Sequence, residues 1–87
     1  MKIKNGFVVR EIAGECVVVA LGEASRIFNG IIKLNETAKI IWNMLSEGSE
    51  KDAVIERILE TYEIDRETAE NDFDRFVSAL KGANILE

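Results

Sequence analysis

The chain has 87 residues, of which 47% are hydrophobic and 31% are charged, and its formal net charge at pH 7 is −5. This composition predicts a single folded domain with a modest core, and it argues against a disordered chain. No apolar run is long enough to span a bilayer, and residues 1–6 lack the apolar segment of a signal peptide. We therefore expect a cytoplasmic protein that makes no contact with a membrane.

The charges are unevenly distributed along the chain. Residues 1–34 contain five Lys or Arg and three Asp or Glu, whereas residues 35–87 contain six Lys or Arg and thirteen Asp or Glu. A strongly acidic second half does not suit the binding of phosphate groups, which requires Lys or Arg near the backbone of the nucleic acid. We expect no nucleic-acid partner, and interpret most of these carboxylates as a solvated surface.

The first part of the chain predicts β-strands. Residues 7–12 and 16–21 are short runs rich in Val and Ile, and Ala13-Gly14 between them is typical of a tight hairpin turn. Residues 16–21 are apolar at every position, which indicates a central strand covered on both faces, or on one face by a partner. Residues 22–26 are interpreted as a loop.

Residues 28–34 predict a third strand. Alternation places Phe28, Ile32 and Leu34 on one face. If the three strands form a meander, this third strand lies at an edge of the sheet and exposes unpaired backbone amides and carbonyls. Lys33 is its only charged residue, so the edge is poorly protected.

Gly30 permits two interpretations. Within a strand it marks a bulge or a place where another backbone comes close. Alternatively, Asn29-Gly30 forms a turn, and Phe28 then belongs to the loop instead of the strand.

Residues 34–48 predict a central helix on which the rest of the chain packs. Asn35 is a good N-cap, and Gly48 provides a left-handed stop at the other end. Helical spacing predicts one apolar face, formed by Ala38, Ile41, Trp42 and Leu45. Trp42 on that face is expected in the core.

A second helix follows directly. Residues 49–52 resemble a capping box with Ser49 at the N-cap and Asp52 at position N3. Its expected apolar stripe consists of Val54, Ile55, Ile58, Leu59 and Tyr62.

A third helix is predicted between an N-cap at Asp65 and a stop at Gly82. Its expected apolar stripe consists of Ala69, Phe73, Phe76, Val77 and Leu80. Ile85 and Leu86 are expected to fold back on the core as a short tail.

Residue types that commonly carry catalysis or bind metals are scarce. The chain has no His, one Cys and no glycine-rich phosphate loop, and no pair of carboxylates is distinguished from the rest. The single Cys16 is interpreted as a small buried hydrophobic residue. We therefore expect neither an enzyme nor a bound cofactor or metal ion.

The sequence Leu-Asn-Glu-Thr-Ala at residues 34–38, followed by Ile41-Trp42, resembles the PqqD-like family, also called RiPP recognition elements. The strand run at residues 6–15 and the pattern of the third helix are similar too. Members of this family bind the leader segment of a ribosomally synthesised precursor peptide during its modification. The resemblance implies one α+β domain over residues 1–87: an N-terminal three-stranded antiparallel sheet followed by a three-helix bundle, related to the winged helix-turn-helix.

The resemblance also implies a site. The leader peptide would add as an extra strand on the edge of the third strand, with side chains entering a groove against the third helix. The implied strand-side contacts are Phe28, Asn29, Gly30, Ile31, Ile32 and Lys33, and those on the third helix are Asp72, Arg75, Phe76 and Ala79. The implied partners are the precursor peptide and a modifying enzyme, in this family often a radical SAM maturase. For Phe76 the alternative is a place in the core.

Two other functions remain open from the sequence. A winged-helix regulator would bind DNA, but residues 65–81 contain three Lys or Arg against five Asp or Glu. A structural homodimer would pair two copies of the chain through the same edge of the third strand.

Overall fold

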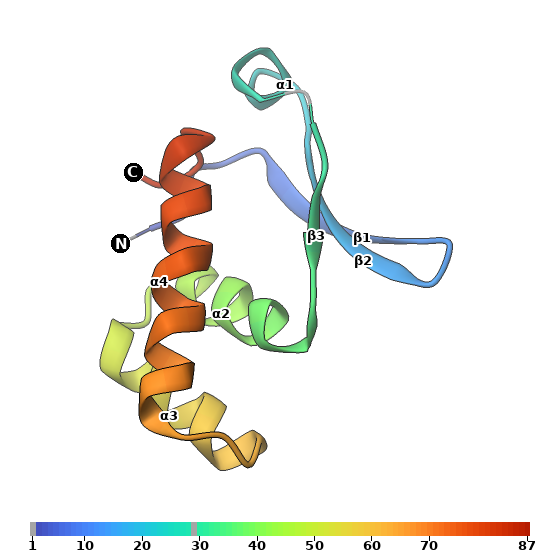
Figure 1. Ribbon diagram of the computed structural model, residues 1–87. Helices are drawn as coiled ribbons and strands as arrows, with labels where there is room; N and C mark the ends of the chain where they lie inside the picture. The colour runs from blue at the N-terminus through green and yellow to red at the C-terminus, as the bar shows by residue number, and fades with distance from the viewer. Residues whose placement is uncertain (1, 29) are drawn as a thin grey trace.

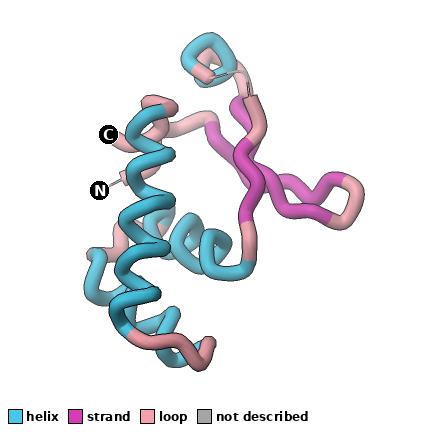
Figure 2. Tube along the Cα trace, in the orientation of Figure 1, coloured by secondary structure: helices cyan, strands magenta, loops and turns pink. Residues whose placement is uncertain are grey.

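The computed structural model describes residues 2–28 and 30–87. Its elements in chain order are β1 (Phe7–Ile12), β2 (Glu15–Ala20), α1 (Ala24–Ile27), β3 (Ile32–Leu34), α2 (Glu36–Ser46), α3 (Lys51–Thr61) and α4 (Arg66–Gly82). The strands form an antiparallel meander in the order β1-β2-β3, and the expected α+β class is confirmed. The helices α2, α3 and α4 gather on one side of β3, while the β1–β2 hairpin projects away from them (Figures 1 and 2).

The hairpin turn forms as predicted at Ala13-Gly14. Both residues have positive φ angles, 54° and 81°, which is the backbone of the type I′ turn that matches the twist of paired strands. Ile12 lies opposite Glu15, so β2 begins one residue earlier than the apolar run indicates.

The segment interpreted as a loop at residues 22–26 overlaps the short helix α1 from Ala24 onward, so that prediction was wrong. Ala24, the first residue of this helix, is buried in the core and lies against Gly6. Gly6 has a φ of +96°, and a Cβ on it would lie 2.7 Å from the Cβ of Ala24. Because Gly6 and Ala24 are far apart in the sequence, the pattern of residues around Ala24 does not predict this contact.

The third strand is also shorter than predicted, covering residues 32–34 in place of 28–34. Phe28 ends α1 by donating its N–H to the carbonyl of Ala24, and its ring lies 6.5 Å from that of Phe7. Gly30 lies in a bend, where a Cβ would be 3.0 Å from the Phe28 ring. Phe28 thus lies outside the strand, as the turn interpretation requires; Asn29 lies outside the described residues.

Both ends of α2 are confirmed. The Asn35 side chain accepts a hydrogen bond from the Ala38 N–H at 2.8 Å. Gly48 has a φ of +84°, and the N–H groups of Gly48 and Ser49 donate to carbonyls of the last helical turn at 3.0 and 2.9 Å. This is the Schellman arrangement, which satisfies carbonyls left free at the helix end.

The capping box predicted for the next helix does not form. The N-cap of α3 is Glu50, whose side chain makes no capping hydrogen bond, because Ser49 already belongs to the termination of α2. The prediction for α4 is confirmed, since the Asp65 carboxylate accepts from the Thr68 N–H at 2.8 Å.

The end of α4 differs by two residues from the prediction. Gly82 remains helical, and the left-handed residue is Asn84, with a φ of 61°. The Ile85 N–H then donates to the Leu80 carbonyl at 2.9 Å. Asn tolerates this backbone because its short polar side chain bonds locally.

The tail after α4 folds back on the core, as expected. Ile85 and Leu86 are buried, and the tail is paired with the beginning of the chain. Lys4 donates its N–H to the Ile85 carbonyl at 2.8 Å, and Glu87 donates to the Lys2 carbonyl at 2.8 Å.

The core is apolar, with no buried polar or charged residue among those described. Trp42 is 3% exposed, which confirms its expected place. The largest fully buried side chains are Phe73, Ile41, Leu45, Ile55, Ile58, Leu80, Ile85, Val18 and Val54. None of the helices in the described residues is long and apolar enough to cross a membrane.

Replacing Gly6 with alanine tests the contact that positions α1. Gly6→Ala should destabilise the fold by about 1–2 kcal/mol for the positive φ, and by about 1–3 kcal/mol more for the clash with Ala24. Gly14→Ala is the matched control, because its φ is +81° but nothing lies within 4 Å of the added Cβ. Equal losses of unfolding free energy in urea titrations of both variants would contradict this account.

Candidate functional site

One edge of the sheet is open. β3 pairs with β2, and within residues 2–28 and 30–87 its other edge pairs with no strand. Backbone N–H and C=O groups on such an edge lack protein partners and provide a template for a further strand.

The register identifies the residues that face this edge. A two-residue hairpin turn makes Ile12 and Glu15 a hydrogen-bonded pair, and the bond from Leu21 N–H to Gly6 O at 2.7 Å continues the same alternation. The odd-numbered residues of β2 therefore bond to β1, and the even-numbered residues bond to β3.

The even-numbered residues of β2 lie opposite Ile32 and Leu34 of β3. Those two residues thus direct their backbone groups to β2. Lys33 directs its N–H and C=O to the open edge, and Ile31 just before the strand continues the alternation.

A groove of about 270 Å³ lies beside this edge. β3 forms one wall and α4 the other, with the beginning of α2 between them (Figure 1). Its lining residues are Ile32, Lys33, Asn35, Thr37, Ala38, Ile41, Asp72, Arg75, Phe76 and Ala79.

The groove is apolar inside and charged along α4. Ile41 and Ala38 are buried at its base, and the half-buried Phe76 and Ile32 reach it from the two walls. Asp72 and Arg75 add one charge of each sign on α4, and in the described residues neither side chain is in an ion pair. Such a groove suits an apolar side chain flanked by polar groups.

Six of the ten residues named from the sequence line this groove: Ile32, Lys33, Asp72, Arg75, Phe76 and Ala79. Phe28, Gly30 and Ile31 do not line it, and Asn29 lies outside the described residues. Ile31 lies at the open edge, and it is 60% exposed. Phe28 packs against the core, so its side chain is committed within the protein.

Four lining residues were not named from the sequence: Asn35, Thr37, Ala38 and Ile41. All four lie at or near the first turn of α2, within the same motif that carries the family resemblance. The sequence predicts Asn35 as a helix cap and places Ala38 and Ile41 on the apolar face of the helix, and it assigns no role to Thr37. Phe76 takes part in both settings, because it packs against the core and also lines the groove.

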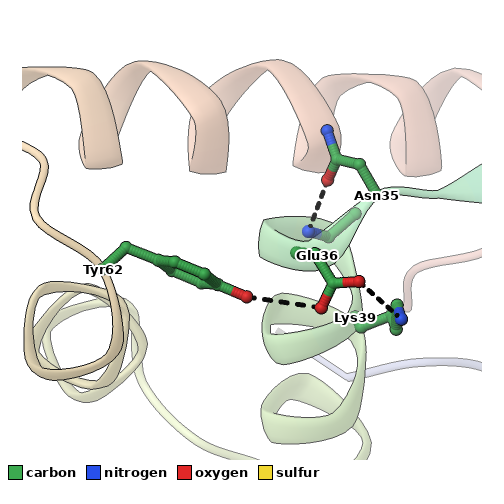
Figure 3. Close-up of polar contacts among 5 residues, drawn as sticks. Asn35, Glu36, Lys39 and Tyr62 are labelled. Atoms are coloured by element: carbon green, nitrogen blue, oxygen red, sulfur yellow. Dashed lines mark hydrogen bonds and ion pairs between the residues drawn. The ribbon is translucent and has the colours of Figure 1, made fainter.

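A polar network joins the first turn of α2 to Tyr62 at the end of α3 (Figure 3). The Glu36 carboxylate accepts from Lys39 Nζ at 3.0 Å and from the Tyr62 hydroxyl at 3.4 Å. The hydrogen bond and charge of Lys39 hold the pKa of Glu36 below its ordinary value, and the same bond raises the pKa of Lys39. Because Tyr62 follows α3 directly, these contacts connect the beginning of α2 to the end of α3.

The fold and the groove define a small α+β binding domain, with an open strand edge beside an apolar groove. Residues 15–86 match the family model described as coenzyme PQQ synthesis protein D (PqqD), and this match covers most of the chain. The chain belongs to the PqqD family.

A solved structure is similar over the whole chain. It is described as TbiB1 in complex with the TbiA(beta) leader peptide, and the two sequences are 30% identical. The similarity covers 100% of this chain and 95% of TbiB1, with a TM-score of 0.78. No curated protein matches this chain.

The Glu36 network predicts a pH dependence of stability. Since the folded pKa of Glu36 lies below the ordinary 4.5, its stabilisation is complete above that value and is lost as the pH falls through the folded pKa. Glu36→Gln should therefore lose less stability than the wild type between pH 7 and pH 3, measured by urea denaturation. Lys39→Met should remove the same part of the pH dependence, and an unchanged dependence in both variants would contradict this role.

Proposed function

We propose that this protein binds the leader segment of a ribosomally synthesised precursor peptide. The peptide adds as a strand to the open edge of β3, with alternate side chains in the groove between β3 and α4. The proposed contact residues are the six residues named from the sequence that line the groove, with the backbone of Ile31 and Lys33 providing the strand pairing.

The observation that carries this proposal is the position of the unpaired β3 edge directly beside the groove. Backbone pairing along the edge supplies affinity for any extended chain, and the groove supplies selectivity for particular side chains. Membership of the PqqD family and the similarity to TbiB1, which was solved with a leader peptide, support the same function.

The proposed partner beyond the peptide is the enzyme that modifies it, for example a radical SAM maturase. In this role the protein is a binding module that presents the precursor, and the partner enzyme performs the chemistry. DNA binding has no such support, because α4 has three basic and four acidic residues along its length.

Proline at Ile31 tests the pairing at the edge. Ile31→Pro removes one donor from the open edge and should weaken the binding of a leader peptide about three- to tenfold, the equivalent of one net hydrogen bond. Isothermal titration calorimetry with peptides encoded by short reading frames beside this gene provides the measurement.

Ile32→Pro is the matched control, because the N–H of Ile32 faces β2 and its loss should destabilise the fold itself. Sedimentation of the free protein at several concentrations separates peptide binding from self-pairing of the same edge. The absence of heat with every candidate peptide at micromolar protein would count against the proposed function.

Filling the groove provides a second test. Ala79 lines the groove and is exposed on α4, so Ala79→Leu should block peptide side chains and weaken binding about tenfold, without changing the thermal midpoint. Ser78→Leu is the control, because Ser78 is exposed on the same helix but does not line the groove. Equal affinities for both variants would exclude this groove as the peptide site.

A further inference from the structure

The outer face of the sheet, opposite the helices, holds an unusual set of side chains. The described residues include three exposed large apolar side chains: Ile12 at 50%, Leu21 at 47% and Ile31 at 60% exposure. Ile12 lies on the outer face of β1, and continuing the alternation of β2 and β3 by one residue places Leu21 and Ile31 on the same face.

The outer face is organised in rows across the strands. In one row Val8 lies opposite Val19, and continuing the register brings Ile31 to the other side of Val19. The next row contains Arg10 and Lys33 on either side of Val17. An apolar row therefore lies beside a row with two basic residues.

Each row ends at the open edge of β3. Ile31 and Lys33 end the apolar and the basic row, and they are also the residues whose backbone groups face the open edge. A strand added there pairs its own residues with Ile31 and Lys33, and side chains of paired residues lie on the same face of a sheet. On the added strand, the residue between the partners of Ile31 and Lys33 lies opposite Ile32, and its side chain points into the groove.

The charges around Lys33 favour an acidic neighbour. Glu15 lies 3.4 Å from Lys33 Nζ, but both side chains are largely exposed, at 58% and 74%, so this ion pair is weak. With Arg10 in the same row, the three charged side chains on this part of the face have a net charge of +1.

We propose that the outer face of the sheet contacts the alternate side chains of the bound peptide: an apolar residue beside Ile31 and, two positions away, a carboxylate beside Lys33. This proposal rests on the proposed peptide binding at the β3 edge, and adds a second set of specificity contacts on the face away from the groove. The occupant is thus an extended peptide with acidic and apolar residues two apart.

A random library of 12-residue peptides, displayed on phage and selected on the intact protein, tests this inference. The selected peptides should share an acidic and an apolar residue two positions apart. With a synthetic selected peptide, Ile31→Ser should raise Kd about two- to fivefold in fluorescence polarisation, the range of one cross-strand pair. Ile12→Ser is the matched control, being similarly exposed on the same face but at the hairpin tip, and its Kd should not change.

Charge exchange tests the basic row independently. Lys33→Glu should weaken binding of the selected peptide, and replacing the peptide's acidic residue with lysine should restore it. If the wild-type protein binds the peptide and neither Ile31→Ser nor Lys33→Glu changes Kd, the outer-face contacts are overturned while peptide binding stands. If the library yields no binding peptide, peptide binding itself fails, and this inference fails with it.

Discussion

Backbone amides and carbonyls require hydrogen-bond partners, and those of Lys33, the middle residue of β3, pair with no strand in the described part of the protein. The Ala13-Gly14 turn sets which residues of β2 hydrogen-bond to β1, and so which bond to β3. This register directs the backbone N–H and C=O of Lys33 away from β2. Water satisfies these groups in the free protein, and a strand from another chain replaces that water with pairing of fixed direction and register. The proposed function depends on this one unpaired edge.

The helices convert an open edge into a selective site. Buried residues such as Phe73 and Leu80 hold α4 against α2 and α3, which directs Phe76 and Ala79 toward β3. The small Ala38 at the base of the groove leaves space between these walls. Pairing at the edge alone would accept any extended chain, whereas the groove accepts particular side chains.

The distribution of charge distinguishes between classes of partner. The helical half of the chain is strongly acidic, and the sheet half has a small excess of basic residues. A phosphate backbone would be repelled by the helices, whereas a peptide with an acidic residue at the β3 edge would lie beside Lys33. The basic residues of the sheet half attract an acidic peptide, which agrees with a peptide partner.

The sequence by itself determined the features that depend on neighbouring residues: the hairpin turn, the caps at Asn35 and Asp65, and the apolar stripes of the helices. It also indicated the poorly protected third strand, and the family resemblance implied six of the residues that line the groove. Local pattern failed where a distant contact decides the conformation, as for α1 packing on Gly6, or where two helix ends compete for Ser49.

Only the tertiary structure decided which side of α4 faces β3 and that the first turn of α2 lies at the groove. It also decided that Ile31 and Lys33 present both backbone and side chain at the same edge. These relations follow from the packing of segments far apart in the chain, for which periodicity within one segment holds no information.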